Sequence, residues 1–172
     1  AHRFIARVLQ DAVEGKRRRR LILTTPPRLG KSRLASVELP TWFLGHNPSK
    51  HVVLASYSAN LSKERSVEAR HRTLEPIYHR IFPGMRSRGI KASSEFWGTN
   101  KWGSFKAVGV GGSLTGRGAD LLIVDDPFSN YEEAHSQTIR DNVWNWFLSV
   151  AMTRLSPDAT VIIIMTRWHV DD

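Results

Sequence analysis

The first pattern in the sequence that could do chemistry is Thr-Pro-Pro-Arg-Leu-Gly-Lys-Ser at residues 25–32. It matches the phosphate-binding loop G-x-x-x-x-G-K-[ST] except at the first position, where Thr25 replaces glycine. Gly30 would let the backbone approach an anion, Lys31 would supply a mobile cation, and the Ser32 hydroxyl would ligate Mg²⁺. The alternative is an ordinary strand-to-helix turn. The pattern predicts an ATP phosphate site formed by Pro27, Arg28, Leu29, Gly30, Lys31 and Ser32.

A second pattern lies at residues 121–126, where four aliphatic residues are followed by two aspartates. Ligands of open parallel sheets bind beyond the carboxyl ends of the strands. We therefore expect Asp125 to hold Mg²⁺, directly or through water, and Asp126 to orient or deprotonate an attacking water. The alternative for Asp126 is a turn or helix-capping acid before Pro127. The prediction requires that the Gly-Lys-Ser corner and the two aspartates lie on adjoining strands and share one Mg²⁺.

Hydrophobic periodicity predicts the elements that position these residues. Helices are expected at residues 2–14, 32–44, 60–80 and 131–155, strands at 21–25, 51–58, 121–124 and 160–165, and a hairpin within 96–110. Buried aliphatic strands that alternate with helices indicate an α/β fold, with a mainly parallel sheet covered on both faces.

Several side chains are assigned to helix faces by their spacing. Helical spacing predicts that Trp144 and Phe147 lie in the core. Glu132 and Glu133 are expected in the first turn of their helix, where they complement its dipole. The residues expected to face inward on the helix at 60–80 are Leu61, Val67, Leu74 and Ile77.

Composition excludes several classes of protein. The absence of cysteine excludes a disulfide scaffold and a thiolate metal site, and six Trp and seven Phe exclude a disordered chain. The longest apolar run, Val161–Met165, is far shorter than the roughly 20 residues of a membrane-spanning helix, so we expect no membrane span. Residues 1–110 hold 21 basic and 7 acidic side chains, which suggests a polyanionic partner. The densest basic run, at residues 16–20, could contact a phosphate backbone or form a solvated turn.

Taken together, these runs resemble the ATPase domain of the large terminase subunit of tailed bacteriophages or prophages. Residues 26–32 and 121–127 carry the resemblance, together with Ala-Ser-Tyr-Ser at 55–58, the glycine-rich run at 109–120 and Met-Thr-Arg-Trp-His at 165–169. The resemblance covers nearly the whole chain. It implies a P-loop NTPase of the RecA-like ASCE class, a three-layer sandwich in which ATP and Mg²⁺ bind at the strand ends.

The resemblance also implies a motor that hydrolyses ATP to drive double-stranded DNA into a preformed capsid in the host bacterial cytoplasm. Its implied partners are the portal protein and the small terminase subunit. The active form would be a homo-oligomeric ring, with the isolated domain a monomer. Because the chain begins without methionine and stops just after a predicted strand, we expect one ATPase domain over residues 1–172, trimmed at both ends and without the nuclease domain of the family.

Three further residues are assigned catalytic roles on this resemblance. Thr166, at the end of a strand, would sense the γ-phosphate and couple hydrolysis to motion, whereas its plain interpretation is a hydroxyl that bonds the backbone. Arg28 would act on the transition state within the subunit, and Arg117 would reach a neighbouring subunit. Their alternatives are a surface charge for Arg28 and a DNA contact or local salt bridge for Arg117.

Two other functions share these motifs. A helicase-like or remodelling ATPase would need a second RecA-like domain and a D-E-x-[DH] box, where this chain has Asp-Asp-Pro-Phe at residues 125–128. A non-catalytic DNA-binding prophage remnant would bind nucleotide without turnover. Two weaker patterns are set aside, since the glycines at 109–112 lack the third glycine of a dinucleotide fingerprint and His169 with Asp172 is more typical of an exposed loop than of a metal site.

Overall fold

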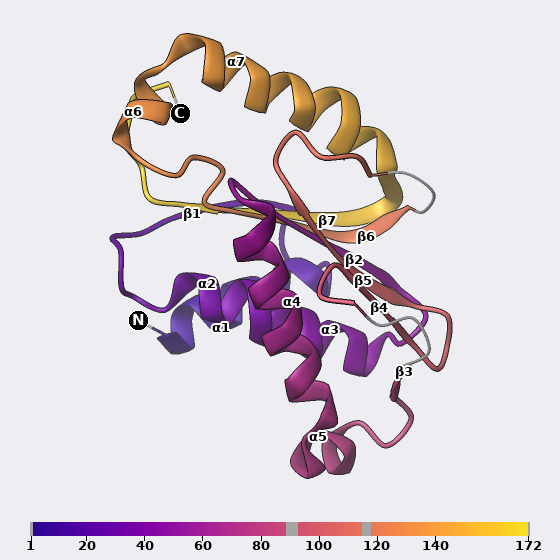
Figure 1. Ribbon diagram of the computed structural model, residues 1–172. Helices are drawn as coiled ribbons and strands as arrows, with labels where there is room; N and C mark the ends of the chain where they lie inside the picture. The colour runs from indigo at the N-terminus through magenta and orange to yellow at the C-terminus, as the bar shows by residue number, and fades with distance from the viewer. Residues whose placement is uncertain (1, 89–92, 115–117, 172) are drawn as a thin grey trace.

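A computed structural model describes residues 2–88, 93–114 and 118–171 of the chain. In these residues a seven-stranded sheet has the order β1-β7-β6-β2-β5-β4-β3 (Figure 1). Five neighbouring strands are parallel: β1 (Arg20–Thr24), β7 (Leu155–Met165), β6 (Ala119–Asp125), β2 (His51–Ser56) and β5 (Ser104–Gly109). The antiparallel strands β4 (Phe96–Thr99) and β3 (Ser87–Arg88) complete one edge, so the predicted hairpin within 96–110 is confirmed.

Helices cover both faces of the sheet, which confirms the predicted three-layer α/β fold (Figure 1). One face carries α1 (His2–Val13), α2 (Lys31–Arg33), the π-helix η1 (Leu34–Glu38), α3 (Leu39–His46), α4 (Ala59–Leu74) and α5 (Pro76–Ile81). The other face carries α6 (Tyr131–His135), α7 (Gln137–Trp146), the π-helix η2 (Phe147–Ala151) and the 3₁₀ turn η3 (Met152–Arg154). No helix among the described residues is long and apolar enough to cross a membrane.

The central strands supply a core to both layers because side chains alternate across a strand. Leu121 and Ile123 of β6 pack with α1, η1 and α3, whereas Leu122 and Val124 pack with the layer of α7. All four side chains are buried. Such continuous burial is what the unbroken aliphatic runs of a parallel sheet predict.

Strand β1 differs from the buried strand predicted at residues 21–25. It lies at the edge of the described sheet and pairs only with β7 there, and Ile22 is 66% exposed. Side chains of the basic run at residues 16–20 bond to other groups of the chain. Lys16 pairs with Glu14, Arg17 with Asp11, and Arg20 donates to the carbonyl of Ala159, which favours the turn interpretation of this run.

The predicted helix at 60–80 is wrong in its length and in its inner face. It ends at Leu74, and Glu75 is extended because a residue before proline is disfavoured in the helical region. The inner face of α4 is made of Ser62, Ser66, Ala69 and Thr73. Of the side chains expected inside, Val67, Leu74 and Ile77 are exposed, and Leu61 is half-buried. Small residues occupy the inner face because α4 lies close to the sheet, where a Cβ on Gly109 would come within 3.1 Å of the Ala59 nitrogen.

The predicted helix at 131–155 is divided, and β7 begins at Leu155 rather than at residue 160. Ser136 starts α7 as an N-cap, accepting a hydrogen bond from the amide of Ile139. Trp144 is 58% exposed, so its predicted place in the core is wrong. The adjacent Trp146 is buried instead and donates its Nε1–H to the carbonyl of Gly112, while Phe147 packs against the core as predicted.

Gly103, in the β4–β5 turn, is a position where a side chain does not fit. A Cβ there would lie 2.4 Å from the carbonyl oxygen of Pro48 and 2.5 Å from that of Lys50. We expect Gly103→Ala to lower the free energy of unfolding by about 1–3 kcal/mol, because backbone must move to admit the methyl group. Urea denaturation measures this loss. The control is Gly84→Ala, since a Cβ there meets nothing within 4 Å. Equal stability of the two variants would contradict the expectation.

Candidate active site

The phosphate loop leaves the end of β1 and enters a helix at Lys31. Arg28 and Gly30 both have left-handed backbones, with φ of 64° and 69°. Helical structure then continues from Lys31 to His46 through α2, η1 and α3. The first amides of a helix have no intrahelical partner and favour an anion. The local fold of this segment therefore agrees with the predicted phosphate site.

Helix α1 supports the loop through a contact that the sequence did not predict. The Nε2 atom of His2 lies 3.0 Å from the carbonyl oxygen of Leu29. A Cβ on Gly30 would come within 3.2 Å of the same ring nitrogen, so the loop passes close to the histidine. No sequence signal singles out this histidine from the six others, because the contact joins segments that only the fold brings together.

The strongest link between the loop and the sheet is the carboxylate of Asp125. This side chain is 2% exposed, and each of its oxygens accepts one serine hydroxyl. Ser32 Oγ donates to Oδ1 at 2.9 Å, and Ser36 Oγ donates to Oδ2 at 2.7 Å. Burial raises the pKa of Asp125 above its ordinary value, while the hydrogen bond from Ser36 opposes that rise. The predicted pair of Ser32 and Asp125 is therefore brought together.

Ser36 is a site residue that the sequence reasoning missed. It is fully buried on η1, one helical turn after Ser32. Residues four apart share a helix face, so its spacing from Ser32 could have identified it. The π-helical turn has a local cause in Pro40, which lacks the N–H that would bond the carbonyl of Ser36.

A second cluster joins Lys31, Thr166 and Asp126 at the ends of β6 and β7. Lys31 is 6% exposed, and its Nζ donates to Thr166 Oγ1 at 2.9 Å and lies 3.7 Å from Asp126 Oδ2. The backbone amide of Thr166 donates to Asp126 Oδ1 at 3.1 Å. Asp126 itself has a left-handed backbone, with φ of 48°. Three of the predicted site residues thus lie in mutual contact.

The expectation that the two motifs lie on adjoining strands is wrong. Strand β7 lies between β1 and β6 in the sheet. The motifs still meet, because Lys31 and Ser32 stand on the helix after β1 and reach Thr166 and Asp125 beyond the strand ends. This places Thr166, at the end of the intervening strand, between the two corners. Sequence order could not have given this, because β7 is the last strand in the chain.

The remaining predicted residues either lie away from these two clusters or fall outside the described residues. Arg28 is exposed in the loop, and Arg117 lies outside the described residues. Glu133 forms a capping box at the start of α6: it accepts from the amide of Ser129, and its own amide donates to Asn130 Oδ1. Glu132 and Glu133 therefore lie in the first helical turn, as predicted. Asp172 also lies outside the described residues, so the pairing of His169 with it stays untested.

The oxygen ligands present suit Mg²⁺, which takes few protein ligands and keeps several waters. The Ser32 hydroxyl and the Asp125 carboxylate are adjacent oxygens beside the phosphate loop. In the described part of the chain, no group of three or more acidic or histidine side chains is arranged to hold a metal. A Mg²⁺ ion at this point would thus depend on phosphate oxygens and water for its other ligands.

A large cavity in the described part of the chain is not part of this site. It is a groove of about 680 Å³ on the opposite face of the sheet, lined by apolar side chains that include Ile22, Trp144 and Ile163. Asp125 faces away from it, since this side chain shares its strand face with Leu121 and Ile123. The site residues Lys31, Ser32 and Asp125 are therefore not among the residues that line this groove.

Comparison with known proteins gives a family and a fold. The family described as "Terminase large subunit, T4likevirus-type, N-terminal" matches residues 22–172. A solved structure of a mutant large terminase ATPase domain from Thermus phage P74-26 is similar with a TM-score of 0.62 at 14% identity, over 94% of this chain and 65% of that one. The large terminase of bacteriophage HK97 is similar with a TM-score of 0.58 at 18% identity, over 94% of this chain and 32% of that one.

A third similar structure is the large terminase of a thermophilic bacteriophage in complex with ADP. Its TM-score is 0.53 at 12% identity, over 91% of this chain and 37% of that one. This chain therefore spans less than two thirds of the length of each of these structures. No curated protein sequence matches the chain.

Removal of the Ser36 hydroxyl tests the two-serine arrangement. We expect Ser36→Ala to lower the free energy of unfolding by about 1–3 kcal/mol, because it leaves one oxygen of a buried carboxylate without a donor. Urea unfolding followed by circular dichroism measures the loss. Ser66→Ala is the matched control, since Ser66 is equally buried and its Oγ has no hydrogen-bond partner among the described residues. A loss no greater than that of the control would show that the bond from Ser36 contributes nothing.

Proposed function

The chain belongs to the family of T4-like large terminase N-terminal domains, and we propose that it hydrolyses ATP with Mg²⁺ to drive double-stranded DNA into a viral capsid. The observation that supports this most directly is the meeting of Ser32 and Asp125 at 2.9 Å. Lys31 lies next to them with Thr166 and Asp126. These are the groups that an ATP phosphate chain and its metal need at one point.

ATP would bind with its phosphates on the loop between β1 and α2. The two left-handed residues, Arg28 and Gly30, open the loop, and the first helical amides supply donors. The Lys31 ammonium has three N–H donors, so it can bond a phosphate oxygen as well as Thr166. The ADP complex of the similar thermophilic phage terminase supports nucleotide binding in this fold.

Ser32 and Asp125 would hold Mg²⁺, which supplies positive charge to the phosphate oxygens when it is bound. Asp126 would orient the attacking water. Its carboxylate is 30% exposed and already faces the Lys31 ammonium at 3.7 Å, so it lies at the edge of the phosphate site. As an aspartate it is one methylene shorter than the usual glutamate, so the water must come closer to the strand end.

Thr166 would couple the phosphate site to the rest of the chain. Its hydroxyl contacts Lys31, and its amide contacts Asp126, so it bonds both a phosphate-binding group and the water-orienting group. Residues 167–171 follow directly, and Arg167 donates to the carbonyls of His169 and Val170. A change in the contacts of Lys31 on hydrolysis would thus reach this segment through one residue.

Arg28 would stabilise transition-state charge from within the subunit, and Arg117 would do so from a neighbouring one. Such an arginine contributes a factor of about 10³–10⁵ to phosphoryl transfer. Activity that depends on Arg117 would require a ring of subunits. The portal protein and the small terminase subunit are the partners that packaging would require, and the host bacterial cytoplasm is its location.

Lys31→Ala tests nucleotide binding. Loss of a charge-assisted bond worth about 1.5–3 kcal/mol should weaken ATP binding by about 10-fold to 150-fold. Isothermal titration with a non-hydrolysable ATP analogue and Mg²⁺ measures this affinity. Lys63→Ala is the control, because Lys63 lies on α4 and pairs with Glu95. If Lys31→Ala binds the analogue as tightly as the control does, the phosphate site lies elsewhere.

Thr166→Val separates coupling from binding. The valine keeps the size of the side chain but cannot bond Lys31, so we expect turnover to fall by about 10-fold or more while analogue affinity changes by less than about 3-fold. Phosphate release is measured with DNA at high protein concentration. Thr160→Val is the control, since Thr160 lies on β7, the strand that Thr166 follows, and bonds the carbonyl of Ala12. Unchanged turnover in Thr166→Val would remove Thr166 from the mechanism.

A further inference from the structure

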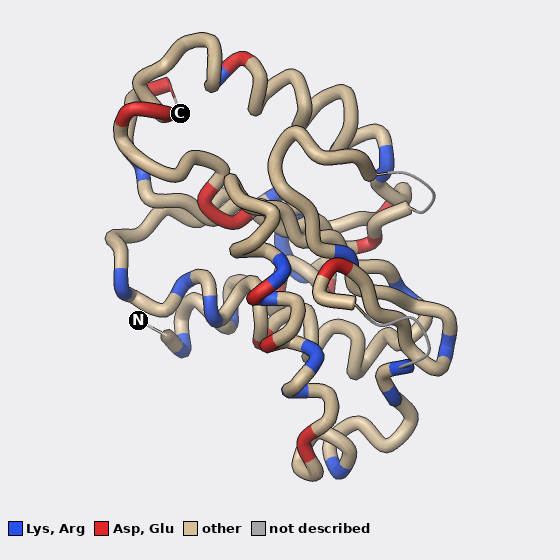
Figure 2. The backbone as a smooth tube through the Cα atoms, viewed as in Figure 1, with Lys and Arg blue, Asp and Glu red and all other residues tan. Residues whose placement is uncertain are grey.

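The end of the sheet opposite the phosphate loop carries an exposed basic surface. It consists of Arg86, Arg88, Lys101 and Trp102, and we name it the Trp102 surface. Arg88 lies in β3, and Lys101 and Trp102 lie in the turn that precedes β5. Figure 2 shows the basic segments of β3 and of this turn close together at one end of the molecule. The candidate active site lies at the other ends of the same parallel strands.

Bonds and one ring contact join the segment at residues 86–88 to the turn at residues 99–103. Two hydrogen bonds join Arg86 and Asn100. The backbone N–H of Arg86 donates to Asn100 Oδ1, and the backbone N–H of Asn100 donates to the carbonyl oxygen of Arg86. The guanidinium carbon of Arg88 lies 5.1 Å from the centre of the Trp102 ring. The backbones that carry the surface are therefore fixed relative to each other, and Arg88 is held against Trp102.

Trp102 has a conformation that the core does not explain. Its backbone is left-handed, with φ of 69°, which is uncommon for a bulky residue and costs about 1–3 kcal/mol. The hydroxyl of Thr99 fixes the turn by accepting bonds from the amides of Lys101 and Gly103. The side chain is nevertheless 74% exposed, so burial does not offset the cost. An outward-facing tryptophan in a rigid turn is suited to contact another molecule.

The charge of this surface is not neutralised within the described structure. Glu95 is the only acidic residue in the sequence between Pro76 and Gly118, and it pairs with Lys63 at 2.7 Å. Lys50, the residue before β2, pairs with Asp120, and its Nζ lies 2.9 Å from Asp120 Oδ1. No acidic side chain of the described residues pairs with the cations of the Trp102 surface.

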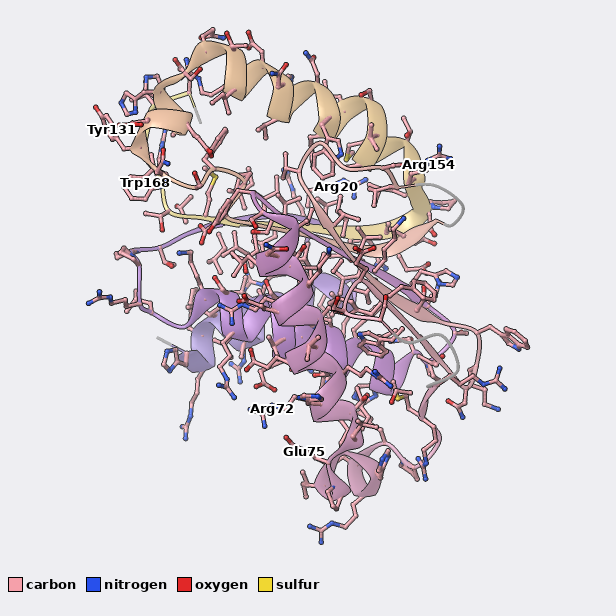
Figure 3. The ribbon with its side chains drawn as sticks, in the orientation of Figure 1. Arg20, Arg72, Glu75, Tyr131, Arg154 and Trp168 are labelled. Atoms are coloured by element: carbon pink, nitrogen blue, oxygen red, sulfur yellow. The ribbon has the colours of Figure 1, made fainter. Side chains whose placement is uncertain are left out.

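Three basic groups of the neighbouring helical layer have acidic partners instead. Arg72 and Glu75 lie together at the end of α4, with a 2.6 Å contact (Figure 3). Arg65 contacts Glu68 at 3.3 Å, and Arg33 contacts Glu38 at the same distance. The Trp102 surface differs from these paired arginines because its adjacent cations have no acidic partner among the described residues, and it combines them with an exposed tryptophan.

We propose that the Trp102 surface binds the sugar-phosphate backbone of double-stranded DNA. The choice of duplex DNA rests on the proposed function; the choice of surface rests on its charge and geometry. Arginine and lysine contact the phosphates, and Trp102 packs against the sugars, which together receive most protein–DNA contacts. Adjacent cations without an acidic partner among the described residues match the regular negative charge of a nucleic-acid backbone, and an acidic protein is the alternative that the test must exclude.

The test measures binding of a fluorescent duplex of mixed sequence by anisotropy over about 50–200 mM salt. Each phosphate contact adds about 0.9 to the steepness of the dependence of log affinity on log salt. The double variant Arg88→Ala/Lys101→Ala should therefore reduce the steepness by about 2 and weaken binding by about 10-fold or more at physiological salt. Trp102→Ala should weaken binding several-fold with the steepness unchanged.

Two control variants separate location from overall charge. Arg3→Ala/Arg7→Ala removes the same charge from exposed positions of α1, and Trp144→Ala removes an exposed tryptophan from the other layer. Both should bind DNA nearly as the unchanged chain does. Thermal unfolding and affinity for the ATP analogue, measured on all variants, show that each is folded.

The outcomes are distinct. If the two double variants lose equal affinity, the surface is misplaced although the proposed function can stand. If poly-glutamate of equal charge competes as well as DNA does, the surface recognises charge alone and the proposal fails. If the unchanged chain binds the ATP analogue but no duplex even at low salt, both this inference and the DNA part of the proposed function fail.

Discussion

The structure of the site depends on one buried carboxylate. Asp125 ends a strand that is covered on both faces, and an unpaired charge at that depth would cost several kcal/mol. Ser32 and Ser36 supply one donor to each oxygen, and both stand on the helix that follows the phosphate loop. Because the buried carboxylate requires these donors, the two bonds hold the helix that carries the serines over the end of β6. The loop before the helix takes its position from the same two bonds.

Strand β7 gives this arrangement its second connection. Since β7 separates β1 from β6, the group that closes the site between them is Thr166, which follows it. Its hydroxyl and its amide face different partners, Lys31 and Asp126. Under the proposed function, a phosphate that shifts the Lys31 ammonium would also alter its bond to that hydroxyl. The residue that follows β7 is therefore bonded both to the helix after the loop and to the residue that follows β6.

Much of this could be predicted from the sequence, where the signal was local. The motifs at residues 25–32 and 121–126 and the aliphatic strands indicated the three-layer fold and the pair of Ser32 and Asp125. What failed depended on tertiary context. The inner face of α4 carries small, mostly polar side chains because the helix lies close to the sheet. The spacing of its apolar residues therefore predicted the wrong inner face. Trp144 and Trp146 are two residues apart, and only the packing decides which is buried.

The order of the strands could not be predicted from the sequence either. No feature of residues 160–165 indicates that this strand lies between the two strands that carry the motifs. Ser36 was a different kind of miss. Its spacing from Ser32 was visible, but a serine on an otherwise apolar helix face gains meaning only when a buried carboxylate is known to face it. The correct rule for such a position is that a buried strand-end acid requires donors from the helix that covers it.

The two ends of the sheet are joined by strands that cannot bend independently. β2 and β5 begin near the Trp102 surface, and β2 ends at Ser56, which pairs in register with Asp125. Five to seven residues at about 3.3 Å each separate the ends by roughly 20 Å. Because β2 and β6 are packed on both faces, a change at the phosphate site cannot be absorbed within them. Under the proposed function, such a change would be passed to the segment after β7, or would move the sheet as a rigid body together with the Trp102 surface.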